Sequence, residues 1–143
     1  MKYFLLLMRL LSAVLIVMIS CSVNAELLTE DGYVRKPIPG RSMSAAFMSI
    51  RNTSTDDIVL TSASLEGAGS VEIHAHSHKD GVMRMRQLQQ LEIKAGQVVE
   101  LEPGGLHLMI FGINHLPEKP ELTLCDQEKK CYSFAIPVRS LIK

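Results

Sequence analysis

The sequence lacks the local patterns of several common catalytic sites. It contains no Gly-x-Ser-x-Gly nucleophile turn, no glycine-rich phosphate-binding loop and no cysteine–histidine motif with an orienting partner. Basic and acidic residues balance at 15 each, so the composition does not suit nucleic-acid binding. Internal repeats and low-complexity segments are also absent from the sequence. These absences exclude nucleophilic catalysis and nucleic-acid recognition as leading interpretations.

An apolar N-terminal segment predicts export. Lys2 and Arg9 lie around an apolar start, residues 10–19 form an apolar run, and small residues end the segment at Ala25. This run is shorter than the ~20 residues that a membrane-spanning helix needs. We therefore predict a signal peptide over residues 1–25 and a periplasmic protein of one domain over residues 26–143. Cys21 leaves a second interpretation open, in which a lipoprotein-type cleavage acylates the chain.

Two of the three cysteines remain after the predicted cleavage. Cys125 and Cys131 flank a charged segment between two β-type runs, in a compartment that permits disulfides. A bond between them would clamp the base of a hairpin and restrict the unfolded chain. Their five-residue spacing matches neither a thioredoxin-type motif nor a common zinc knuckle. The sequence therefore predicts a structural disulfide.

Short β-type segments separated by turn residues make up the rest of the chain. Alternating apolar and polar residues predict strands, and Gly, Pro and Asn clusters between them predict turns. The expected strands are residues 32–35, 44–51, 58–64, 70–76, 82–87, 97–101, 106–111, 121–124 and 132–138. Residues 26–31 are expected to be a loose lead-in. This pattern indicates an all-β antiparallel sandwich or barrel.

Histidine and methionine residues cluster between residues 74 and 115. They alternate along three of the expected strands, as His74, His76 and His78, then Met83 and Met85, then His107 and Met109. Residues two apart on a strand share a face, so three strands can direct imidazole and thioether groups at one point. A lone methionine is commonly a core gap-filler, and Met43 and Met48 are assigned to packing or chance exposure. His115 is expected in a loop without metal.

The spacing of four of these residues resembles that of a known family. His74, Met85, His107 and Met109 are separated by ten, twenty-one and one residues. This order reproduces the His-x10-Met-x21-His-x-Met pattern of the periplasmic copper(I) chaperones called PCuAC proteins. The neighbouring segments 71–74, 80–86 and 103–109 are also similar to that family, and the resemblance spans roughly residues 32–138.

The resemblance implies both a fold and a metal site. The fold would be an antiparallel Greek-key β-sandwich of the cupredoxin-like type. His74, Met85, His107 and Met109 would bind copper(I), with His76 as an additional candidate. Apart from the resemblance, His76 and His78 either belong to a polar turn or add nitrogen ligands to copper(II), which favours imidazole over thioether. The protein would be a monomeric metallochaperone, not an enzyme. Its acceptor would be a cytochrome oxidase copper centre or another copper chaperone.

These side chains suit copper(I) on chemical grounds. Copper(I) is a soft ion that prefers thioether sulfur and imidazole nitrogen over hard oxygen ligands. In an oxidising compartment paired thiolates risk conversion to a disulfide, whereas Met and His survive. Thioethers also need no deprotonation before they bind metal. We expect the ligands at an exposed end of the sandwich, where an acceptor can replace them one at a time.

Two other classes of function remain open at this stage. A zinc-dependent hydrolytic enzyme would use His74, His76 and His107 as nitrogen ligands, with water at the fourth position and Glu72 nearby. A non-metal exported assembly domain would instead bind a partner through a sheet edge or an apolar patch, and it would not bind copper tightly. Competition between zinc and copper(I) separates these interpretations from the thioether-led site.

Overall fold

A computed structural model describes residues 26–140 of the chain. Eleven strands make up its regular structure, and no helix among these residues is long and apolar enough to cross a membrane. The predicted signal peptide and Cys21 lie outside the described residues. The strands are β1 (Leu27–Arg35), β2 (Met43–Asn52), β3 (Ile58–Leu65), β4 (Ser70–Lys79), β5 (Val82–Leu88), β6 (Leu91–Ile93), β7 (Val98–Leu101), β8 (Leu106–Phe111), β9 (Glu121–Asp126), β10 (Cys131–Ala135) and β11 (Val138–Arg139).

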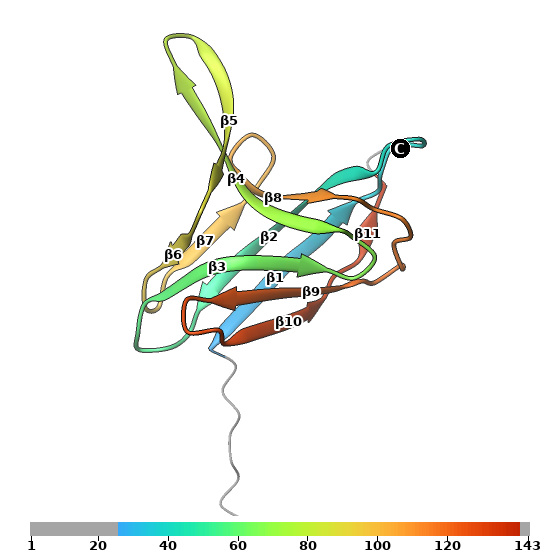
Figure 1. Cartoon of the computed structure of the whole chain (residues 1–143). Helices are drawn as coiled ribbons and strands as arrows, with labels where there is room; N and C mark the ends of the chain where they lie inside the picture. The colour runs from blue at the N-terminus through green and yellow to red at the C-terminus, as the bar shows by residue number, and fades with distance from the viewer. Residues whose placement is uncertain (1–25, 141–143) are drawn as a thin grey trace, which may run out of the picture.

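The strands form a sandwich in which β3, β9 and β10 cross in front of β1 and β2 (Figure 1). Hydrogen bonding follows the order β10-β9-β3-β4-β8-β7-β2-β1-β11, with β5 attached to β4 and β6 to β3. Strands distant in the chain pair with each other, as β3 does with β9 and β2 with β8, which is the kind of long return that Greek-key folds use. The prediction of an all-β sandwich is confirmed.

The prediction of purely antiparallel pairing is wrong at two places. β1 pairs with β11 in parallel, with Val34 opposite Val138, because the last strand continues past β10 to the other layer. β7 pairs with β8 in parallel at one position, where Leu101 lies opposite Leu106. The turn between the two strands brings the start of β8 beside the end of β7. The sheet is therefore mixed, although all other pairings are antiparallel.

Alternate burial on β8 fixes which side chains face the core. Leu108 and Ile110 are fully buried in the hydrophobic core between the layers. A one-residue slip of this strand would move both to the opposite face, so their burial specifies the register strongly. His107 and Met109 alternate with these two residues and therefore project from the other face of the strand. Core packing is thus what orients two of the predicted metal ligands.

The N-terminal segment is a strand, and its prediction as a loose lead-in is wrong. β1 begins at Leu27, which is buried and lies opposite Asn52 of β2. The register shifts between Glu30 and Tyr33, where Asp31 adopts a positive φ of 53°. This irregularity breaks the alternation of apolar and polar residues, and the sequence pattern therefore misses the first half of the strand.

The predicted disulfide is confirmed. Cys125 and Cys131 are bonded and lie directly opposite each other on β9 and β10. Between them the chain turns, and the buried Asp126 carboxylate accepts hydrogen bonds from the backbone N–H groups of Glu128 and Lys130. The covalent bond and these hydrogen bonds together fix the tip of the hairpin.

Candidate metal centre

The strand register places all the predicted ligands on one face of the sheet. In an antiparallel pair, residues directly opposite each other project to the same side. β4 lies between β5 and β8. Alternate residues of β4, namely Glu72, His74 and His76, each lie opposite a residue of β5 or β8. The pairs are His76 with Met85, His74 with His107, and Glu72 with Met109.

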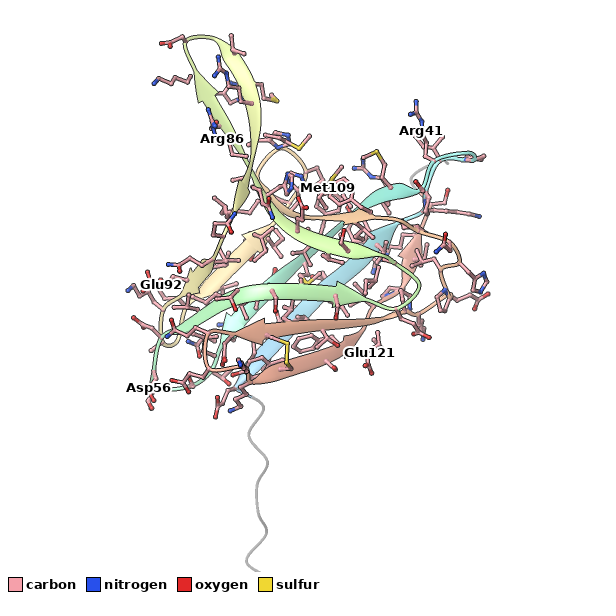
Figure 2. The ribbon with its side chains drawn as sticks, viewed as in Figure 1. Arg41, Asp56, Arg86, Glu92, Met109 and Glu121 are labelled. Atoms are coloured by element: carbon pink, nitrogen blue, oxygen red, sulfur yellow. A yellow bond between two sulfur atoms is a disulfide. The ribbon has the colours of Figure 1, made fainter. Side chains whose placement is uncertain are left out.

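One pocket gathers three of the four predicted ligands. Met85, His107 and Met109 line a pocket of about 320 Å³, together with the additional candidate His76. Met109 lies at the foot of the projecting β4–β5 hairpin in Figure 2. The His76 and His107 rings are adjacent, with their centroids 5.1 Å apart. Imidazole and thioether groups from β4, β5 and β8 therefore border the same space.

His74 lies beside this pocket and does not line it. Its ring packs between those of His107 and Phe111, with centroids 5.9 Å and 6.4 Å away. Its Nε2 atom is 2.8 Å from a carboxylate oxygen of Glu72, and an ionised carboxylate can only accept this hydrogen bond. Nε2 therefore carries the proton, and Nδ1 keeps its lone pair. That Nδ1 atom is buried and has no hydrogen-bond partner.

The other two histidines also present nitrogen atoms suited to a metal. His107 donates a hydrogen bond from Nδ1 to the Gly105 carbonyl oxygen at 3.1 Å, which leaves Nε2 unprotonated. The Nδ1 atom of His76 is buried without a partner, like that of His74. Metal-binding histidines commonly donate their second ring N–H to a carboxylate or a backbone carbonyl, as His74 and His107 do here. A bound cation would satisfy the unpartnered nitrogens.

Burial keeps His107 available as a neutral ligand. The side chain is 4% exposed, and burial is the main reason that its pKa is lowered from the ordinary value. The Gly105 carbonyl opposes this effect, while His76, His74 and Arg35 add to it by disfavouring a further positive charge. Since only the unprotonated imidazole binds metal, the lowered pKa favours binding at neutral pH.

The structure adds pocket residues that the sequence pattern did not select. Met43 is 41% exposed and lines the pocket from β2, as do Phe47 and Arg35 from their strands. No histidine lies near Met43 in the sequence, and its place beside Met109 follows only from the pairing of β2 with β8. By contrast Met48 is 3% exposed and belongs to the core, as predicted.

The three histidines do not form a closed nitrogen site of the zinc type. Among residues 26–140, no group of three or more His, Cys, Asp or Glu side chains is arranged to hold a metal ion. The donors that converge on the pocket are a mixture of imidazole nitrogen and thioether sulfur. A mixed set of this kind matches a soft cation better than a hard one.

Sequence comparison places the chain in one protein family. Residues 27–138 match the family described as "Putative lipoprotein LpqE-like". A relative from Leifsonia xyli, "Putative lipoprotein Lxx21020", is 29% identical over 104 residues, which cover 70% of this chain. The same alignment covers 63% of the relative, so this chain spans under two thirds of that protein's length.

Solved structures share the fold. A copper-bound PCuAC domain from PmoF2 superposes with a TM-score of 0.66 at 18% identity, over 80% of this chain and 93% of that domain. The copper(I) form of DR1885 from Deinococcus radiodurans has a TM-score of 0.63 at 25% identity, over 78% of this chain and 77% of that protein. The resemblance to PCuAC proteins is confirmed in the fold, and the chain belongs to the LpqE-like lipoprotein family.

Proposed function

We propose that the protein binds copper(I) and carries it as an exported metallochaperone. The observation that carries this proposal is the convergence of Met85, His107 and Met109 on one pocket beside buried histidine nitrogens that lack partners. Structures of the same fold bind copper, namely the domain from PmoF2 and DR1885 in its copper(I) form. The donor chemistry and the fold therefore support the same cargo.

Four residues form the proposed ligand set. Met85 and Met109 supply sulfur, and His107 supplies Nε2, because its Nδ1 is engaged by Gly105. His74 supplies Nδ1 from beside the pocket, with Glu72 holding its ring. The ionised Glu72 carboxylate also offsets the single positive charge that copper(I) would bring to otherwise neutral ligands. His76 is the additional nitrogen donor, and it would matter most for copper(II).

Exposure of one ligand supports transport over permanent storage. The Met85 side chain is 53% exposed, whereas His107 is buried. An acceptor can approach Met85 from solvent and displace it first, before the buried histidine releases the ion. A carrier needs such an accessible ligand, so the proposed mode of release is ligand exchange.

The location and the acceptor complete the proposal. The family and the Leifsonia relative are both described as lipoproteins, which supports export to the periplasm or an outer surface. Mass spectrometry of the purified protein distinguishes cleavage after Ala25 from acylation at Cys21. The proposed acceptor is a copper centre such as that of cytochrome oxidase, or another copper chaperone, and the proposed carrier is a monomer. This last part rests on the resemblance to PCuAC proteins alone.

A copper(I) competition titration tests the proposal. A chromogenic copper(I) chelator competes with the wild-type protein and with Met85→Leu and Met109→Leu variants under anaerobic conditions. Loss of one sulfur ligand should weaken copper(I) binding roughly tenfold or more. Loss of an outer-sphere partner already costs about tenfold in metal affinity, and loss of a direct ligand should cost at least as much. Met48→Leu is the matched control, because Met48 lies in the core and a Leu–Met exchange costs little stability. Unchanged affinity in both pocket variants, or tighter binding of zinc than of copper(I), contradicts the proposal.

A further inference from the structure

The β4–β5 hairpin carries a second histidine–methionine pair beyond the pocket. His78 and Met83 lie directly opposite each other, next to the turn that joins the two strands. They share a face with His76 and Met85, because each member lies two residues along its own strand. The next rung of the same ladder is thus about 7 Å from the pocket rung, at 3.4 Å per residue. Figure 1 shows that this hairpin projects from the sandwich.

Packing does not account for the second pair. The Met83 side chain is 57% exposed and makes no contribution to the core, and His78 is also exposed. The His78 ring has no hydrogen bond or ion pair with any side chain that the structure describes. An exposed thioether opposite an exposed imidazole offers a soft cation two donors without any need to displace a structural contact.

The two faces of the hairpin differ in chemistry. His76, His78, Met83 and Met85 occupy one face, and Arg84 with Arg86 alternates onto the other. Arg86 is labelled on the hairpin in Figure 2. Soft, uncharged donors are therefore gathered on the pocket side, while the cationic side chains, which would repel a metal ion, project from the opposite side. This segregation gives the hairpin a continuous row of donors that leads to the pocket.

We propose that His78 and Met83 form an outer binding site of lower affinity for copper(I), through which the ion enters and leaves the pocket. The inference rests on the proposed function, because an outer site needs an inner one. Transfer is a ligand exchange in which the bond from copper to the Met83 sulfur breaks as the bond to Met85 forms. The ion stays copper(I) throughout, so no oxidant or reductant takes part.

Methionine methyl NMR on the copper(I)-titrated protein tests this inference. The first equivalent should shift the methyl signals of Met85 and Met109, and the second should shift that of Met83. Met48, in the core, is the internal reference that should not move. Met83→Leu should abolish the second binding step and slow copper(I) transfer to a chelator severalfold, while the affinity for the first equivalent stays within twofold. His78→Gln should weaken the second step at least threefold.

Val82→Ala is the matched control variant. Val82 is 50% exposed on the same hairpin, opposite Lys79 and on the face without the donors. If it slows transfer as much as Met83→Leu does, the hairpin acts as an apolar contact and the outer site is refuted. A Met83 signal that stays fixed at two equivalents, while Met85 and Met109 shift, also refutes the outer site but leaves the proposed function standing. No shift of any methionine at either step refutes the proposed function itself.

Discussion

Removal of the Glu72 carboxylate should weaken copper binding without unfolding the protein. Glu72 accepts the hydrogen bond that fixes the His74 ring, at 2.8 Å, and its negative charge lies close to the proposed cation. Loss of an outer-sphere partner of this kind costs about 10–100-fold in metal affinity, or about 1.4–2.7 kcal/mol. Glu72→Gln keeps an acceptor oxygen and loses the charge, so we expect the lower end of this range. Glu72→Ala loses both and should reach the upper end.

The assay is copper(I) competition at neutral pH, with thermal unfolding of the metal-free variants measured in parallel. Because the Glu72 side chain is 34% exposed, its loss should change the free energy of unfolding by less than about 1 kcal/mol. Glu30→Gln is the control and should leave affinity unchanged, because Glu30 is an exposed carboxylate on β1 that does not line the pocket. Wild-type affinity in Glu72→Ala would refute the role given to Glu72 and, with it, the use of His74 through Nδ1.

Three further predictions concern stability. Replacement of Cys125 and Cys131 by Ser should lower the free energy of unfolding by about 2 kcal/mol in denaturant titrations. Copper(I) affinity should stay unchanged, because β3 separates the strands that carry the disulfide from β4; a variant as stable as the wild type would contradict this prediction. Burial chiefly raises the pKa of Tyr132 to about 12, so the stabilisation that this group contributes is complete below pH 10 and is lost as the pH rises from 10 to 12. Ultraviolet titration of Tyr132→Phe should lack this late phase, and an unaltered titration curve would be the contrary result. Gly67→Ala should lower the free energy of unfolding by about 2 kcal/mol or more, measured by thermal unfolding, because Gly67 has a φ of 81° and an added Cβ would overlap the His115 carbonyl oxygen. Gly40→Ala is the control and should cost less, because Gly40 has a similar φ of 80° but open space around it.

Local patterns in the sequence predicted most of the sandwich. On β8, for example, Leu108 and Ile110, which are buried in the core, alternate with His107 and Met109 along the strand. Turn residues marked the ends of the strands, and two cysteines on either side of a charged turn predicted the disulfide. These features are local, so a pattern of a few residues is enough to reveal them. Alternation also places the predicted ligands of each strand on one face, whereas the register between β4, β5 and β8 brings the three strands' ligands to the same side.

Features that depend on contacts between distant segments were missed. The first half of β1 interrupts its alternation at Asp31, and only its pairing with β2 makes it a strand. The parallel pairing of β11 with β1 depends on how the layers close, which no short segment encodes. Met43 reaches the pocket because β2 lies beside β8. Distance along the chain hides all of these contacts.

X-ray absorption spectroscopy of the copper(I)-loaded protein tests the central claim most directly. The proposed site predicts a first coordination shell that contains both imidazole nitrogen and thioether sulfur, supplied by His107 and His74 and by Met85 and Met109. The sulfur contribution should disappear in a Met85→Leu/Met109→Leu double variant, whereas the imidazole contribution should remain. A wild-type shell made only of nitrogen and oxygen would contradict the account.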